Sequence, residues 1–214
     1  MKYIIMCGGK YRGWETPRQL TKINGESIVE RTIRLLREDG VENIAISSNH
    51  EAFEHFGVPV LHHENPYDTD DYTEFSGNWV DGFYPITEPV CYIFGDVVFS
   101  PKAIRTIVET ETDDIEFFAS APPFADKYFK PYAEPFALKV ANQYRLKRSI
   151  EILRDLDKRG MFRRRPIMWE LWQVIKGTEL NHIDYTNYTV INDYTCDVDC
   201  EWDARQFTQI LKEG

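Results

Sequence analysis

Short apolar runs recur along the first half of the chain, and segments with helical spacing lie between them. Val29, Ile33 and Leu36 recur at intervals that predict a helix, which Gly40 is placed to end. Residues 100–108 begin with Ser-Pro, which is typical of a helix start, and predict a second helix. Continuous apolar runs typical of buried strands cover residues 3–6, 43–47, 90–94 and 115–119.

This alternation of strands and helices predicts the fold class. It favours a mostly parallel, Rossmann-like central sheet with helices on both faces, a three-layer α/β/α arrangement. The second half is less regular, although its patterns still predict elements. We expect strands over residues 136–140 and 188–192, and helices over residues 73–83, 149–157, 166–175 and 201–211. Because the sequence shows no internal repeat and no clear linker, residues 1–214 are expected to form a single domain.

Composition and charge narrow the classes of ligand. The formal net charge of −10 argues against a nucleic-acid or membrane partner, because both require a basic face. Basic residues cluster over residues 10–18 and 163–165, a distribution that suits a small anionic ligand. No apolar run approaches the ~18 residues that would span a bilayer. The four cysteines lack CxxC spacing, which favours reduced thiols and a cytoplasmic location, with a zinc site as the weaker alternative.

The turn after the first predicted strand carries the most informative chemistry. Gly8 and Gly9 let the backbone approach a ligand, so that their N–H groups can donate to phosphate oxygens. Lys10 and Arg12 follow and would offset the charge of a triphosphate. The loop has neither the Gly-Lys-Ser/Thr spacing of a P-loop nor GxGxxG. A tight turn with solvated basic side chains is the alternative.

The order of these features resembles the nucleotidyltransferases of the GT-A-like fold, a group that includes the MobA-like and sugar-phosphate nucleotidyltransferases. The shared pattern reads Cys7-Gly8-Gly9, Arg12, Pro17-Arg18-Gln19-Leu20 and Asn24-Gly25-Glu26. The family carries lysine where this chain has Arg18, and that lysine contacts phosphate near the reacting centre. Arginine keeps the charge but is not a simple replacement. Either Arg18 grips phosphate in a bidentate way, or Lys10 or Lys22 contributes.

Two acidic segments carry the expected ligands of Mg²⁺, the cofactor that the resemblance implies. Asp96 follows a buried strand and Gly95, a position from which a carboxylate can hold a hard cation at the sheet edge. Its alternative role is to cap the turn before the next helix. In the resemblance, Asp199 of residues 197–203 is the second metal ligand and Asp203 is a helix N-terminal charge. A solvated acidic turn is the alternative there.

Other site residues are expected from the family pattern, from the predicted topology or from their local charge. The expected catalytic residues are Arg12 and Arg18. The expected nucleotide contacts are Cys7, Gly8, Gly9, Lys10, Asn49, Ser76 and Gly77. Glu134 and Arg163 are expected to face the acceptor. Three of these residues have an alternative role without a ligand: Asn49 as a turn residue, Gly77 as a glycine that interrupts a helix, and Arg163 as part of a solvated basic stretch.

The resemblance implies Mg²⁺-dependent transfer of a nucleoside monophosphate from a nucleoside triphosphate to a phosphorylated sugar, polyol or alcohol, with release of pyrophosphate. Residues 1–120 would form the nucleotide-binding half and residues 121–214 the acceptor-binding half. The nucleotide stays open among CTP, UTP and GTP, and a homodimer is a base-rate expectation. Two alternatives are a glycosyltransferase of the same fold that uses a nucleotide sugar, and a non-catalytic nucleotide sensor, which Arg18 in place of lysine would suit.

Overall fold

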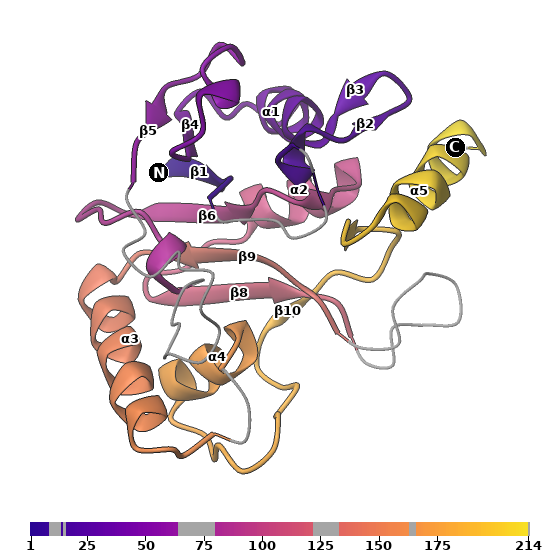
Figure 1. The fold of residues 1–214 in the computed structure, drawn as a ribbon. Coiled ribbons are helices and arrows are strands. Elements are labelled where there is room, and N and C mark those ends of the chain that lie inside the picture. The colour runs from indigo at the N-terminus through magenta and orange to yellow at the C-terminus, as the bar shows by residue number, and fades with distance from the viewer. Residues whose placement is uncertain (9–13, 15, 64–79, 122–132, 163–165, 214) are drawn as a thin grey trace.

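A central sheet organises the protein in its computed structural model, which describes residues 1–8, 14, 16–63, 80–121, 133–162 and 166–213. Within these residues the sheet has seven strands, in the order β10-β8-β9-β6-β1-β4-β5 (Figure 1). They are β1 (Lys2–Met6), β4 (Ile44–Ser47), β5 (Val60–Leu61), β6 (Val90–Phe94), β8 (Ile115–Ala119), β9 (Pro135–Val140) and β10 (Thr189–Val190). The apolar sequences of β1 and β6 suit strands that are covered on both faces.

Strand direction decides which residues meet at one edge of the sheet. Met6 of β1 lies beside Ser47 of β4 and Phe94 of β6 in parallel register, so these three strands end together. β9 runs antiparallel between β6 and β8, so its first residues lie at the same edge. The other neighbouring pairs are parallel, which confirms the predicted mostly parallel sheet. β9 and β10 also place segments from the second half of the chain in the same sheet as the first half.

Helices cover both faces of this sheet, as the alternating pattern predicts (Figure 1). They are α1 (Ile28–Glu38), α2 (Pro101–Glu109), α3 (Gln143–Lys158) and α4 (Met168–Lys176), and a fifth helix, α5 (Glu201–Glu213), lies to the side of the sheet. α1 and α2 pack on one face, in the core that includes Ile5 and Phe136. α3 and α4 pack on the other face, in the core that includes Phe117 and Trp169. None of the described helices is both long and apolar enough to cross a membrane.

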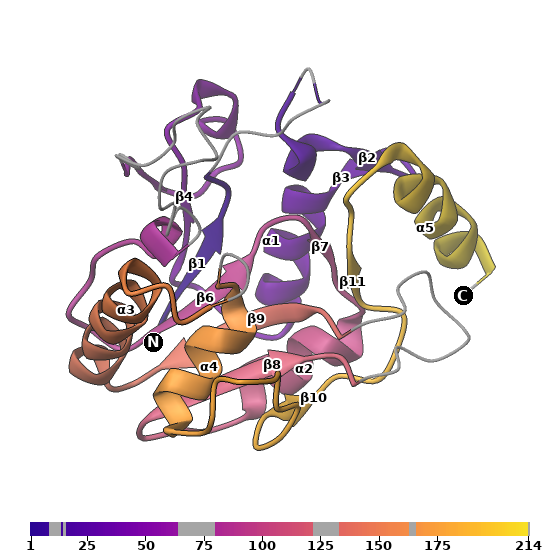
Figure 2. The ribbon, with the colours of Figure 1, turned by 60° about the horizontal axis from the view of Figure 1, so that its bottom comes forward.

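The C-terminal segment of the chain packs beside the N-terminal part of the protein (Figure 2). The short strands involved are β2 (Lys22–Ile23), β3 (Glu26–Ser27), β7 (Val97–Val98) and β11 (Cys196–Asp197). β11 pairs antiparallel with β7, and α5 packs against the hairpin of β2 and β3. Asn24 and Gly25 both have positive φ in the turn of that hairpin, a conformation that Asn-Gly pairs adopt readily. An apolar cluster that includes Val198 and Phe207 joins these pieces.

Three predicted elements differ from the structure. α3 begins earlier than expected, because the Asn142 side chain caps it by accepting from Arg145 N–H. The strand expected over residues 188–192 pairs only at Thr189–Val190, at the edge of the sheet. Of the helix expected over residues 73–83, residues 73–79 lie outside the described residues. The described end, Val80–Gly82, is a 3-10 helix, and it ends before Pro85, which disfavours helical backbone in the residue ahead of it.

Candidate active site

The end of β6 carries the first predicted metal ligand to the edge where the parallel strands end. Gly95 N–H donates to Met6 O at 3.1 Å, so this end of β6 lies tightly against the end of β1. A Cβ at Gly95 would overlap Met6 O and lie 2.8 Å from Cys7 Sγ, so a side chain does not fit there. Asp96 is the next residue, and ligands of such sheets bind at this edge.

A short 3-10 helix, η1 (Arg18–Leu20), brings Arg18 to the same edge. Pro17 precedes it, and Leu20 N–H donates to Pro17 O at 2.9 Å to close the turn. Gln19 is buried beside Gly95, and Leu20 packs against the core under α1 and α2. The packing of these two neighbours fixes the backbone from which the Arg18 side chain reaches the edge.

Asp199 reaches this edge from the other end of the chain. Val198 N–H donates to Asp96 O at 2.9 Å and extends the pairing of β11 with β7. The segment before Asp199 therefore runs beside the segment after Asp96. The Trp14 indole N–H also donates to Asp199 O at 3.3 Å, a contact that the sequence pattern does not predict.

Arg18 joins the two predicted metal ligands. Its Nη2 lies 2.8 Å from Asp96 Oδ2, and its Nη1 lies 2.6 Å from Asp199 Oδ1. Nη1 also donates to Val198 O at 3.4 Å. The Arg18 and Asp96 side chains are 20% and 24% exposed, so solvent screens this pair less than it screens an open surface pair. Two carboxylates from distant parts of the sequence thus face one cation.

Asp203 holds the backbone of Asp199. Its Oδ2 accepts N–H bonds from Asp199 at 2.8 Å and from Cys200 at 3.0 Å, and its side chain is buried. Asp203 lies in the first turn of α5, where N–H groups lack partners within the helix and a negative charge is favourable. This placement fits the predicted helix N-terminal charge.

Cys7, which directly precedes Gly8, is held in place by hydrogen bonds to Ser47 and Ser48. Its N–H donates to Ser47 O at 2.9 Å, and its carbonyl oxygen accepts from Ser48 Oγ at 3.0 Å. Burial raises the pKa of its thiol well above the usual range, and the negative charge of Asp96 adds to the effect. The thiol is therefore a neutral packing group, and a direct contact of Cys7 with nucleotide stays a prediction.

Other predicted site residues lie near the same edge. Gly8 has open space where a Cβ would stand. Asn49, after β4, accepts the His63 N–H through Oδ1 at 2.7 Å. Glu134 lies directly before β9, and its N–H donates to Ser120 Oγ at 2.7 Å. Their ligand contacts stay predictions. Gly9, Lys10, Arg12, Ser76, Gly77 and Arg163 lie outside the described residues.

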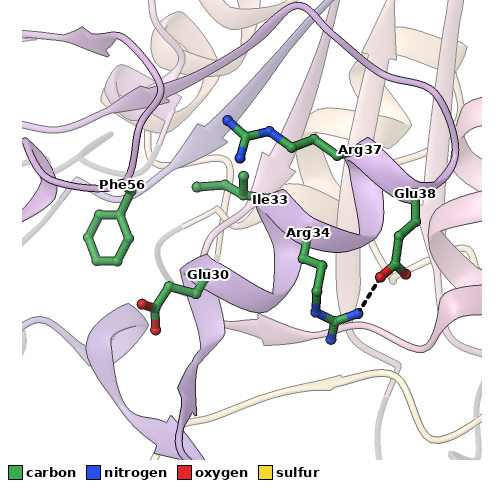
Figure 3. Close-up of a pocket in the computed structure, with 6 residues that line it drawn as sticks. All are labelled: Glu30, Ile33, Arg34, Arg37, Glu38 and Phe56. Atoms are coloured by element: carbon green, nitrogen blue, oxygen red, sulfur yellow. Dashed lines mark hydrogen bonds and ion pairs between the residues drawn. The ribbon is translucent and has the colours of Figure 1, made fainter.

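A separate hollow of about 380 Å³ lies against α1 (Figure 3). It is lined by Glu30, Ile33, Arg34, Arg37, Glu38 and Phe56. Arg34 pairs with Glu26 and Glu38, and Arg37 donates to a main-chain oxygen. Its two arginines therefore already have partners within the protein, and none of the predicted site residues lines it.

The donor set at the sheet edge fits a Mg²⁺ ion whose coordination is completed by substrate. Mg²⁺ is usually bound by one or two carboxylates together with phosphate oxygens and water. Within the described part of the chain, no group of three or more His, Cys, Asp or Glu side chains could enclose a metal. Asp96 and Asp199 would supply two carboxylates, and their convergence on one guanidinium shows that both can face a single cation.

Solved nucleotidyltransferases share the whole fold. The inositol-1-phosphate CTP transferase from T. maritima has a TM-score of 0.58 at 14% identity, over 100% of this chain and 96% of that one. A candidate glucose-1-phosphate thymidylyltransferase from Bacillus anthracis has a TM-score of 0.57 at 15% identity, over 100% and 96%. The CTP:phosphocholine cytidylyltransferase from Streptococcus pneumoniae has a TM-score of 0.51 at 16% identity, over 98% of both chains.

The fold is therefore that of the GT-A-like nucleotidyltransferases, as predicted. A family model, the MobA-like NTP transferase domain, matches residues 3–120, which is more than half of the chain. The chain belongs to this family and is a nucleotidyltransferase, which confirms the resemblance. No curated protein matches it by sequence.

Proposed function

We propose that this nucleotidyltransferase is Mg²⁺-dependent and transfers a nucleoside monophosphate from CTP, UTP or GTP to a small phosphorylated alcohol, polyol or sugar. The observation that carries the proposal is the convergence of Asp96 and Asp199 on Arg18 at the ligand edge of the sheet. Two structural relatives are named for CTP and for inositol-1-phosphate or phosphocholine, so CTP and alcohol phosphates are the first substrates to test.

The acceptor phosphate would supply the nucleophile, so the protein needs no covalent catalytic residue. An acceptor oxygen attacks the α-phosphorus of the triphosphate and forms the new P–O bond. The bond from the α-phosphorus to the oxygen that bridges it to the β-phosphorus breaks, and pyrophosphate leaves with that electron pair. The task of the protein is then to align the two phosphates and to neutralise their charge.

Each part of this task has a candidate in the site. Asp96 and Asp199 would hold Mg²⁺, which when bound neutralises charge on the phosphates and the leaving group. Arg18 stands in place of the family lysine, and its planar guanidinium can hold two phosphate oxygens at once. Main-chain N–H groups of Gly8 and Gly9 would donate to further phosphate oxygens.

Pyrophosphate release with Mg²⁺ tests the proposal. Each ribonucleoside triphosphate is combined with pooled alcohol, polyol or sugar phosphates, and release should require one triphosphate and one pool. Asp96→Asn should lower the rate by about 10²–10³-fold, because it removes a charged ligand of the Mg²⁺ that would neutralise the reacting phosphates. Glu201→Gln is the matched control: this carboxylate is 85% exposed and pairs with Arg205, and its loss should leave the rate unchanged.

Two other outcomes would overturn the proposal. Transfer from a nucleotide sugar without pyrophosphate would identify a glycosyltransferase. Tight binding of a triphosphate with no pyrophosphate release in any combination, from protein shown to be folded, would identify a sensor.

A further inference from the structure

The guanidinium that joins the two carboxylates is also the one expected to bind phosphate. We propose that Arg18 is an internal counter-cation, which competes with a divalent metal for Asp96 and Asp199 until a triphosphate draws it away. This inference rests on the proposed function and adds an order of binding to it. The metal enters with the nucleotide or after it, because the free enzyme keeps the carboxylate pair occupied by its own arginine.

Competition follows from the atoms that Arg18 uses. It contacts Asp96 Oδ2 at 2.8 Å and Asp199 Oδ1 at 2.6 Å, each through its own terminal nitrogen. Hydrogen bonds between ions are stronger than neutral ones, and this guanidinium makes one to each carboxylate. A divalent ion at the same oxygens would meet a positive charge at contact distance, in a half-buried setting where repulsion is poorly screened.

The side chain can leave while the backbone stays. Gln19 and Leu20, the next residues of η1, are packed into the core and fix the main chain. The Arg18 side chain is 20% exposed and is long enough to reach a ligand at the same edge. Its contact with Val198 O, at 3.4 Å, is at the long limit of a hydrogen bond and adds little to hold it.

The identity of the residue matters for this competition. The fork of arginine presents separate nitrogens to two carboxylates, whereas the lysine ammonium is a compact point charge. Arg18→Lys should therefore loosen the bridge while keeping the charge. Arginine in place of the family lysine should therefore exclude free metal from the two carboxylates more strongly.

Direct binding of Mn²⁺, used as a paramagnetic probe in place of Mg²⁺, tests the competition without nucleotide or turnover. The signal of free Mn²⁺ is followed during titration of the intact protein. Arg18→Gln should bind Mn²⁺ roughly tenfold more tightly than the native protein, a size usual for coupled sites. Arg105→Gln is the charge-matched control, because Arg105 is 62% exposed and pairs with Asp39. It should bind as the native protein does.

A double variant tests whether the gain in Mn²⁺ affinity arises at the two carboxylates. Arg18→Gln combined with Asp199→Asn should lose the tighter binding, because one of the two carboxylates is gone. Equal Mn²⁺ affinity in native protein and Arg18→Gln would overturn the inference, and so would a gain that survives in the double variant. Circular dichroism verifies folding of each variant. If Arg18→Gln fails to fold, Arg18→Lys provides the same comparison with a smaller gain.

Because coupling is reciprocal, the phosphate side can be measured as well. In the presence of a chelator, freeing Arg18 from Asp199 should strengthen binding of inorganic tripolyphosphate. Asp199→Asn should bind it about fivefold more tightly than Glu201→Gln, which removes the same charge nearby. Equal affinities of these two variants would contradict the release of Arg18 toward phosphate.

These tests fail independently of the proposed function. A Mn²⁺ gain in Arg18→Gln, together with no pyrophosphate release, would keep the competition and overturn nucleotidyl transfer. Unchanged Mn²⁺ affinity in an active enzyme would overturn only the competition.

Discussion

Single residues decide how the second carboxylate is held. Asp199 is the most exposed member of the cluster, with 48% of its side chain accessible, so its position depends on its main chain. Asp203 accepts the N–H groups of Asp199 and Cys200, and Trp14 donates to Asp199 O. We therefore regard Asp203 as a positioning residue, which acts on the site through the backbone of Asp199.

Removal of the Asp203 carboxylate should uncouple Asp199 from the site. Asp203→Ala leaves two N–H groups without their acceptor, which should cost about 1–3 kcal/mol of stability. It should also raise the Mg²⁺ concentration needed for half-maximal rate, measured by pyrophosphate release. Asp203→Asn keeps an amide oxygen as acceptor and should restore most of the native Mg²⁺ dependence. An unchanged Mg²⁺ dependence in Asp203→Ala would show that Asp203 only stabilises the helix.

For single residues, the sequence predicts which side chains carry out the chemistry better than it predicts which residues they contact. Asp96 and Asp199 can be singled out because each follows a recognisable local pattern and matches a family motif. The contact of Trp14 with Asp199 and the burial of Gln19 under Gly95 depend on residues far away in the chain. No local periodicity reports such contacts, and a polar glutamine gives no sign that it will be buried.

The C-terminal helix is the element that supports the second carboxylate. α5 packs on the β2–β3 hairpin, and its Phe207 is fully buried with Ile23 and Val198. β11, which pairs with β7, leads into the same segment. The position of Asp199 thus depends on the docking of a helix to the first hairpin of the chain.

Loss of the Phe207 ring should weaken this docking. Phe207→Ala should lower the free energy of unfolding by about 3–5 kcal/mol, because it leaves a cavity in a small apolar cluster. It should also lower the rate of pyrophosphate release at a temperature where the variant is fully folded, so that the loss cannot come from unfolded protein. Gln209→Ala, an exposed change on the same helix, should affect neither quantity. Native activity in folded Phe207→Ala would refute this role of α5.

Longer elements follow from sequence patterns and shorter ones do not. α1, α2, α5 and the central strands are predicted closely, because apolar spacing and capping residues mark them. β2, β3, β7 and β11 have two residues each, too few for a periodic pattern. β2 and β3 pair through the local Asn24-Gly25 turn, whereas β7 and β11 pair across a long stretch of sequence, and this second pairing is what brings Asp199 to Asp96.

At the scale of the whole molecule, the central sheet buries several titratable groups, and burial shifts their pKa values away from the usual range. Burial raises the pKa of the Cys91 thiol from 9.0 to about 12 and also raises the pKa values of Tyr3 and Tyr92. Lys139 is buried on β9, where it donates to Val108 O and Thr110 O at the end of α2, and burial lowers its pKa. Stability should therefore depend on pH in the alkaline range.

Alkaline pH should destabilise the fold, and Cys91 should account for part of the effect. Below about pH 9 the thiol is protonated in both states. As the pH rises from 9 toward 12, the unfolded chain loses a proton that the folded protein keeps, so the free energy of unfolding falls. Lys139 acts in the opposite direction, and because it pairs with Cys91 across β6 and β9 and the Cys91 thiolate raises its pKa, loss of the thiol also lowers the pKa of Lys139, which adds to the shallower decline. Urea unfolding of Cys91→Ala should show a shallower decline than the native protein, and identical declines would contradict this assignment.

The fate of the phosphorus atoms of the triphosphate tests the central claim most directly. The triphosphate and acceptor that release pyrophosphate are incubated with the enzyme, with label placed at either the α- or the γ-phosphorus. Nucleotidyl transfer predicts that the α label enters the acceptor product and the γ label enters pyrophosphate. A γ label found in the acceptor, or an α label found only in free nucleoside monophosphate, would contradict the claim that this site transfers a nucleotide.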